Sequence, residues 1–150
     1  MDETRFNVFA DIQAIMTNTS LPESFFESVL ERLLSFGYTL KETDGVELGF
    51  VIQKLENHVK NSCNTNSVPE GLFNAAVDAV CGEFLFTKKQ TGRLELNDLD
   101  LTGAVTSIKE GDTSVNFGSG TSEDEKLTLF LNILMHSMDG DLVCYRRMQW

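Results

Sequence analysis

The sequence is poor in basic residues, and this shortage limits what the protein can bind. It has 12 lysines and arginines against 23 aspartates and glutamates, which gives a net charge of −11. Proteins bind a phosphate backbone mainly through Lys and Arg side chains, so the composition argues against direct binding to nucleic acid. It still allows a protein that surrounds DNA, because an acidic wall repels DNA and lets it slide.

Cysteine and histidine are also scarce. The three cysteines, Cys63, Cys81 and Cys144, are widely spaced and form no C-x-x-C pair, which favours a reducing compartment and structural thiols. A zinc site would require the two histidines, His58 and His136, to converge with the cysteines. We expect no such convergence, and we expect no metal and no cofactor.

Long apolar runs are missing as well. No stretch approaches the length needed to span a membrane, and the acidic start Met1–Glu3 is unlike the basic beginning of a signal peptide. We therefore expect no membrane contact. A chain of 150 residues is long enough to bury one substantial core, so residues 1–150 are predicted to form a single domain.

Apolar residues recur at helical spacing in several segments, which predicts a mainly α-helical fold, a small bundle of four to five helices. The predicted helices span residues 3–17, 20–37, 44–63, 67–86 and 122–138. In the first helix the predicted apolar stripe consists of Phe6, Phe9, Ile12, Ile15 and Met16. The helix at 67–86 is small or apolar around most of its circumference, so we expect it in the middle of the bundle.

Helix starts are predicted from S-x-x-E spacing, in which a serine and a glutamate cap the first turn. This spacing occurs at Ser20, Ser67 and Ser122, and Asp44 with Glu47 marks a further start. The polar link at 61–66 is short, so the helices on either side of it should pack antiparallel. Together these signals divide the chain into a helical bundle at 1–90 and later segments.

Residues 91–121 break the helical pattern with several glycines. Within them, 104–108 and 113–117 are rich in β-branched residues and are separated by a glycine turn, which predicts a β-hairpin. A lone hairpin is only marginally stable in water. We therefore interpret 91–121 as a long arm that needs a partner.

Three patterns suggest ligand or catalytic chemistry only weakly. Residues 97–103 resemble part of a calcium loop, but the glutamate that should complete it, Glu110, falls one place late. Residues 117–121 resemble a phosphate loop without its lysine, and a hinge is the better interpretation. His136 lies near Asp139, yet no nucleophile motif accompanies it, so we predict that the protein is not an enzyme.

The C-terminal segment 139–150 is predicted to be an extended tail. It concentrates residue types that are enriched at interface hot spots. These candidate docking residues are Tyr145, Arg146, Arg147, Met148 and Trp150. The alternative is a tail that folds back on its own bundle.

Several segments together resemble the head–tail connector proteins of long-tailed bacteriophages of low-GC Gram-positive hosts. The resemblance covers about residues 30–150, and residues 1–29 do not contribute to it. The segments that carry it are Ser35–Tyr38, Leu48–Asn61, Val68–Leu72, Ala76–Asp78, Cys81–Phe86, Ala104–Val105, Ser107–Thr113 and Cys144–Arg147.

The resemblance implies a structural virion protein at the head–tail interface, assembled in the bacterial host cytoplasm. Its copies would form a homo-oligomeric ring, usually a dodecamer, beneath the portal protein and above a stopper or tail-completion protein. DNA would pass through the ring without specific binding. The tail from Tyr145 to Trp150 would dock on the portal. The intersubunit arm would present Val105, Ile108, Lys109, Glu110, Asp112, Val115 and Phe117 to the neighbouring subunit.

Three other functions stay open at this point. The first is a neighbouring virion part, a head-completion (stopper) or tail-completion protein, which also assembles as a ring. The second is an acidic regulatory protein that mimics DNA and binds a host enzyme. The third is a small hydrolase that uses His136.

Overall fold

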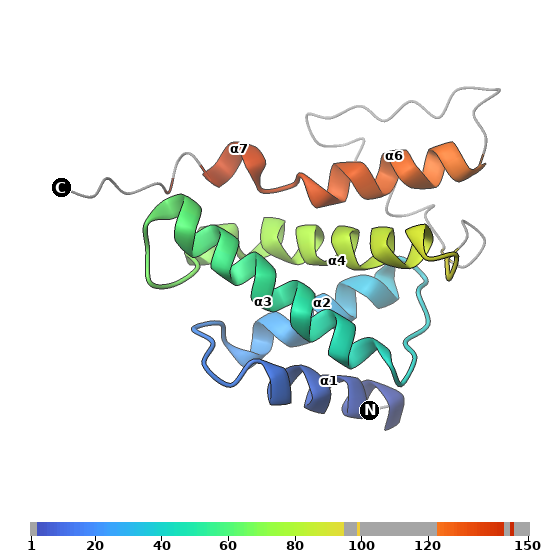
Figure 1. Ribbon diagram of the computed structural model, residues 1–150, viewed down its shortest axis with the longest axis horizontal. Helices are drawn as coiled ribbons and strands as arrows, with labels where there is room; N and C mark the ends of the chain where they lie inside the picture. The colour runs from blue at the N-terminus through green and yellow to red at the C-terminus, as the bar shows by residue number, and fades with distance from the viewer. Residues whose placement is uncertain (1–2, 95–98, 100–122, 143–144, 146–150) are drawn as a thin grey trace.

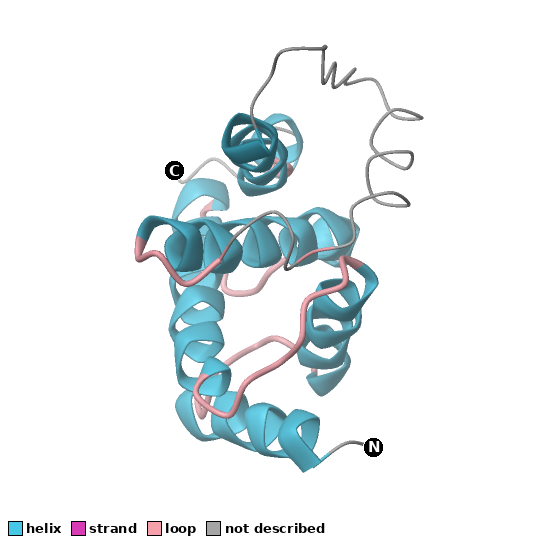
Figure 2. Ribbon diagram, turned by 90° about the vertical axis from the view of Figure 1, so that its right-hand side faces the viewer, coloured by secondary structure: helices cyan, strands magenta, loops and turns pink. Residues whose placement is uncertain are grey.

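The computed structural model describes residues 3–94, 99, 123–142 and 145 (Figure 1). Within these residues the chain forms helices and connecting turns, with no strand (Figure 2). The elements are α1 (Glu3–Ile15), α2 (Glu23–Ser35), α3 (Asp44–Cys63), the 3₁₀ turn η1 (Glu70–Leu72), α4 (Phe73–Gln90), α6 (Glu123–Met135) and α7 (Asp139–Leu142). The prediction of a mainly α-helical bundle is confirmed. The predicted hairpin at 104–117 lies outside the described residues.

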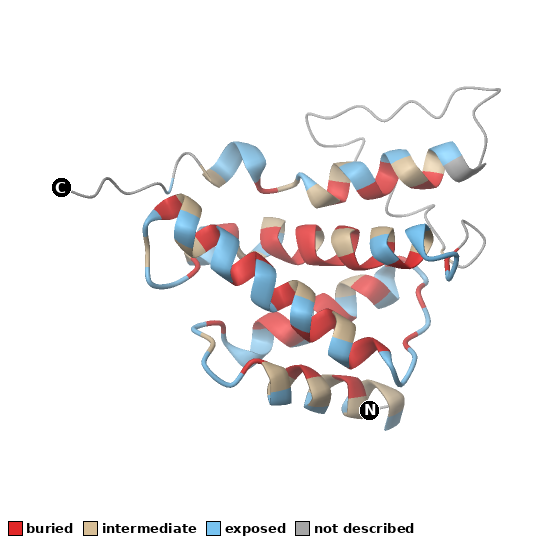
Figure 3. Ribbon diagram, in the orientation of Figure 1, coloured by how far each residue is buried: buried red, intermediate tan, exposed pale blue. Residues whose placement is uncertain are grey.

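Helix α4 lies in the middle of the bundle, as its apolar sequence predicted. It packs against α2, α3 and α6, and Figure 3 shows buried positions along most of its length. The close approach of α6 depends on Gly82, where an added Cβ would lie 2.6 Å from the Cβ of Leu134. A larger residue at 82 would push these two helices apart, because the surrounding core is close-packed.

Helices α3 and α4 run in opposite directions, as the short polar link between them predicted. Asp44 at the start of α3 pairs with Lys88 near the end of α4, and Lys54 pairs with Glu83. The link begins at Asn64, which adopts a left-handed conformation with φ of 54°. Asparagine tolerates this conformation better than most residues, so α3 ends one residue before it.

Helix α1 packs closely on α3 through two glycines that are one turn apart. A Cβ at Gly45 would lie 2.6 Å from the Cβ of Asp11, and a Cβ at Gly49 would lie 2.7 Å from Cδ1 of Ile15. The two glycines therefore bring the helix axes together along the first two turns of α3.

The predicted apolar stripe of α1 is wrong at one position. Phe6 is 60% exposed, whereas Val8 is fully buried in its place. Polar contacts on both flanks fix the rotation of the helix. Arg5 forms an ion pair with Glu31 of α2, and Asn7 donates a hydrogen bond to Glu42 before α3. These contacts turn Phe6 outward.

The predicted capping boxes at Ser20 and Ser67 are also wrong. The residue preceding α2 is Pro22 and the residue preceding α4 is Leu72, and neither makes a side-chain cap hydrogen bond. The η1 turn separates Ser67 from α4, so the central helix begins at Phe73, later than predicted. The start of α3 at Asp44 is confirmed, and Ser122 lies outside the described residues.

The C-terminal part of the chain differs from its prediction in two ways. Helix α6 ends at Met135 and not near 138, and residues 139–142 form the short helix α7 where an extended tail was predicted. α7 contacts α3. The Cys63 thiol lies 3.7 Å from the carbonyl oxygen of Leu142, to which it donates a weak hydrogen bond.

Candidate functional site

A buried ion pair connects the start of α3 to the end of α4. The Nζ of Lys88 lies 2.7 Å from Oδ1 of Asp44, and the two side chains are 1% and 0% exposed. A charged pair with so little contact with water is costly to bury. The pair therefore adds little net stability, but it fixes how the two helix ends are placed relative to each other.

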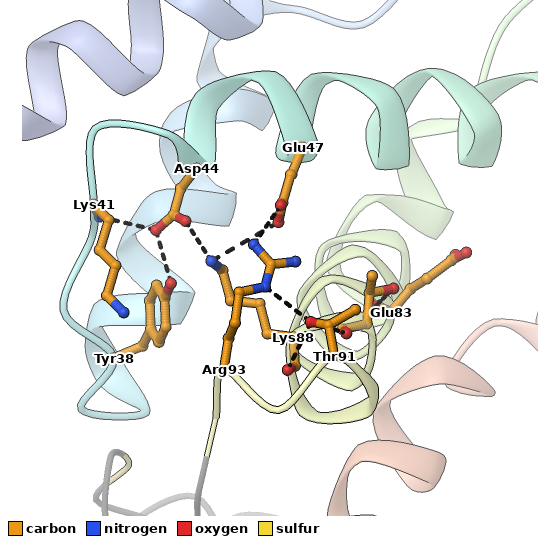
Figure 4. A network of polar contacts seen from close by, with 9 residues as sticks. Tyr38, Lys41, Asp44, Glu47, Glu83, Lys88, Thr91 and Arg93 are labelled. Atoms are coloured by element: carbon orange, nitrogen blue, oxygen red, sulfur yellow. Dashed lines mark hydrogen bonds and ion pairs between the residues drawn. The ribbon is translucent and has the colours of Figure 1, made fainter.

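Tyr38 completes the burial of this pair. Its hydroxyl donates a 2.7 Å hydrogen bond to Oδ2 of Asp44, which also accepts one from the backbone N–H of Lys41 (Figure 4). Its ring packs edge-to-face on Phe84 of α4, with 5.7 Å between the centroids. Burial and the bond to Asp44 raise the pKa of Tyr38 well above its ordinary value, because both favour the neutral phenol. Tyr38, Asp44 and Lys88 are named here the buried anchor.

An outer layer of charges covers the buried anchor. Oε2 of Glu47 lies 3.8 Å from Nζ of Lys88, and Oε1 of Glu47 accepts a 2.6 Å hydrogen bond from Arg93. This bond raises the pKa of the Arg93 guanidinium. Arg93 also donates to the hydroxyl of Thr91, and its backbone N–H donates to the carbonyl of Lys88. Figure 4 shows these groups converging at the end of α4.

The buried anchor fixes the place where the chain leaves the bundle toward residue 95. The segment from Lys88 to Leu94, named here the arm root, is tied to α3 by the two ion pairs, and Leu94 at its end is buried in the core. Every charge in the site has an opposite charge beside it. The arrangement can therefore position a segment, and it presents no unpaired nucleophile or base for chemistry.

The buried anchor was missed by sequence reasoning, although the sequence holds a signal for it. Lys88 follows Phe84 by four residues and Leu85 by three, so it continues the apolar stripe of the central helix. A lysine in that register needs a buried partner. Asp44 was interpreted only as a helix start, and nothing in the local pattern relates it to a residue so distant in the sequence.

A second buried carboxylate ties the loop between α1 and α2 to α3. Oε2 of Glu56 accepts hydrogen bonds from the hydroxyl of Thr19 and from both the backbone N–H and the hydroxyl of Ser20, at 2.7–3.1 Å. Its other oxygen lies 3.8 Å from Nζ of Lys60. The Ser20 hydroxyl therefore serves Glu56, which is the physical reason why it does not cap α2.

Of the predicted docking residues of the tail, the structure describes Tyr145. Its hydroxyl lies against Gly71 in η1, so that a Cβ added at Gly71 would clash with it. Tyr145 is 36% exposed. Arg146, Arg147, Met148 and Trp150 lie outside the described residues. At Tyr145, the described docking position, the tail contacts its own bundle.

The predicted arm residues lie outside the described part of the chain, and their role stays a prediction. They are Val105, Ile108, Lys109, Glu110, Asp112, Val115 and Phe117. The calcium-like and phosphate-like patterns lie there as well, except Leu99, which packs partly buried against the core.

His136 and Asp139 do meet, on the surface. Their Nδ1 and Oδ2 atoms are 2.8 Å apart, and both side chains are more than half exposed. The neighbouring Ser137 hydroxyl donates to the carbonyls of Ile133 and Leu134. It is therefore turned toward its own helix and is not positioned as a nucleophile for His136.

The described cysteines are buried and stand apart from the histidines. Cys81 donates a weak hydrogen bond to the carbonyl of Val29, and burial raises the pKa of its thiol. His58 of α3 is exposed. Among the described residues, no cluster of His, Cys, Asp or Glu could hold a metal ion. Cys144 lies outside them.

An open groove of about 560 Å³ runs between α2 and α4. Arg32 crosses it, donating a 2.7 Å hydrogen bond to Asp78 and lying 4.7 Å from the ring centroid of Phe36. Because Arg32 pairs with Asp78 and Glu31 pairs with Arg5, the groove does not indicate a particular ligand.

Comparison with known proteins found no match to this chain among family models, curated proteins or solved structures. In the part of the chain that the structure describes, no helix is both long enough and apolar enough to cross a membrane.

Proposed function

We propose that this protein is a phage head–tail connector, a structural subunit that forms a ring beneath the portal and extends the DNA channel. The proposal draws on the resemblance of residues 30–150 to that family and on the helical bundle. It includes a homo-oligomeric ring of twelve subunits, contacts with the portal and with a stopper or tail-completion protein, and a location in the virion.

The observation that carries the proposal is the buried anchor. A ring subunit that reaches its neighbour through an arm needs a stiff body and an arm that leaves it in one direction. The pair of Lys88 and Asp44, almost wholly withdrawn from water, holds the arm root in one position. The hairpin form of the arm at 104–117, and its contact with a neighbouring subunit, belong to the proposal.

The charge of the chain supports the same function. A net charge of −11 disfavours binding to DNA phosphates, which suits a channel through which DNA must slide. Ring closure requires head-to-tail contacts between identical subunits, and such contacts need no catalytic chemistry. A stopper or tail-completion protein is the second candidate, because it would share these properties and dock elsewhere.

Co-sedimentation with the portal ring of the same phage tests the proposal. Full-length protein should bind in a ring-like ratio, whereas a chain ending at Asp141 should not. A matched control replaces residues 142–150 with a glycine–serine segment of equal length, which separates loss of docking side chains from loss of length.

Each outcome decides between functions. If the truncated chain also binds, the connector function stands and docking resides in the arm or the bundle. If full-length protein fails to bind under assembly conditions, the connector is wrong, and binding to a tail-completion ring or to a host DNA-binding enzyme distinguishes a tail-completion protein from an acidic regulatory protein.

A further inference from the structure

Gly71 lies in the η1 turn between α3 and α4, and Tyr145 of the tail contacts it there. Helix α7 contacts α3, and the Cys63 thiol reaches the Leu142 carbonyl. Figure 1 shows α7 above the turn that joins α3 to α4. Asp139–Leu142 together with Tyr145 are named here the tail root.

The contact at Gly71 is of a kind that only glycine allows. A Cβ at this position would clash with the Tyr145 hydroxyl and would lie 2.8 Å from Cζ of the same ring. The nearest atoms are all from this one side chain, the far end of a rotatable tyrosine. A methyl group at 71 would therefore displace the tyrosine and leave the backbone in place.

Tyr145 is also one of the residues predicted to dock on the portal. This side chain approaches Gly71 with its hydroxyl, Cζ and Cε1 atoms. It cannot offer those atoms to a partner at the same time. The tail root is otherwise lightly held, because α7 has no buried residue, Leu142 is only partly buried against the core, and the sulfur contact is weak.

We propose that Gly71 is a seat for Tyr145, and that this tyrosine must leave the seat before it contacts the portal. The inference depends on the proposed connector function. The seat lowers the population of subunits whose tail is ready to dock. The apparent affinity for the portal is then the intrinsic affinity multiplied by the fraction of subunits in which Tyr145 has left Gly71. Ring assembly is thereby biased toward sites where a portal is present to compete for the tyrosine.

Gly71→Ala removes the seat, and Gly140→Ala is its matched control. Gly140 lies in α7, and a Cβ added there meets no atom within 4 Å. Both variants add one methyl group near the tail root, but one of them alone displaces Tyr145. Helical circular dichroism checks that both full-length variants fold like the natural chain.

Nitration with tetranitromethane reports the seat directly. The chain has two tyrosines, and Tyr38 is 4% exposed, so modification in the folded protein reports Tyr145. We expect nitration to be faster in Gly71→Ala and unchanged in Gly140→Ala. Equal nitration rates in the natural chain, Gly71→Ala and Gly140→Ala would show that Tyr145 is not held at Gly71.

Portal binding by the same proteins tests the release step. Gly71→Ala should bind the portal ring about fivefold more tightly, near the lower end of coupling between sites, and Gly140→Ala should bind like the natural chain. Unchanged or weaker binding by Gly71→Ala, with faster nitration, would overturn the release step. If no protein binds the portal, the connector function fails, while the nitration rates still decide whether the seat exists.

Discussion

The arm root and the tail root are attached to the bundle in different ways. At the arm root, Lys88 and Asp44 form an ion pair that is almost fully buried, and Arg93 adds an outer pair with Glu47. At the tail root, α7 has no buried residue, and Tyr145 is 36% exposed where it lies on Gly71. The difference indicates that the arm is fixed where it begins, whereas the tail is held by contacts that a partner can replace.

Breaking the buried anchor should have the largest effect on stability. Lys88→Met leaves the Asp44 carboxylate buried without a cation, which should lower the free energy of unfolding by about 3–5 kcal/mol. Urea denaturation measures the change. Lys54→Met is the matched control, because Lys54 pairs with Glu83 at the surface and is 73% exposed. It should cost less than about 1 kcal/mol. Equal losses in the two variants would show that the anchor is no stronger than a surface pair.

Removing one hydroxyl from the anchor should have the next largest effect. Tyr38→Phe keeps the ring on Phe84 but takes the hydrogen bond from Oδ2 of Asp44. A buried acceptor that loses a donor costs about 1–3 kcal/mol, again measured in urea. If stability is unchanged, water replaces the hydroxyl, and the site is wetter than the contacts indicate.

Alkaline pH should weaken the anchor through the same hydroxyl. The pKa of Tyr38 is raised in the folded protein by burial and by Asp44, so the unfolded chain loses this proton first, near its ordinary pKa of about 10. The contribution is complete below about pH 10 and is lost as pH rises above it, by up to about 1.4 kcal/mol per pH unit. Unfolding free energies measured from pH 9 to 11 should fall less steeply in Tyr38→Phe than in the natural chain. Parallel curves would contradict this assignment.

The tail root should give the smallest effect. Tyr145→Ala removes a partly exposed ring that contacts the bundle at Gly71, so the free energy of unfolding should change by less than about 1 kcal/mol. The same urea series measures it beside Lys88→Met. A loss as large as that of the anchor variant would mean that the tail root is part of the core, and the comparison would fail.

The sequence predicted the helices well because their apolar spacing is local. The central position of α4 could be predicted from apolar residues on all its sides. The rotation of α1 could not be predicted, since Phe6 and Val8 are both apolar and contacts with Glu31 and Glu42 choose between them. The capping signal at Ser20 was misleading because a distant carboxylate, Glu56, takes the serine hydroxyl.

The candidate site was predictable to a smaller extent. The register of Lys88 in an apolar stripe indicates a buried cation, but its partner is on another helix and emerges only from tertiary packing. Tyr145 is the described residue among those predicted to dock, and its docking role stays a prediction. Its contact with Gly71 depends on how η1 and α7 meet, and no spacing in the sequence shows that.

Hydrogen–deuterium exchange at the two roots, with and without the portal ring, tests the central claim most directly. In the free protein, amides of residues 88–94 should exchange slowly and those of residues 139–142 and Tyr145 quickly, because buried contacts protect only the first. Adding the portal should slow exchange at the tail root and leave the arm root unchanged. Equal exchange at the two roots in the free protein, or no protection of the tail root by the portal, would contradict the account.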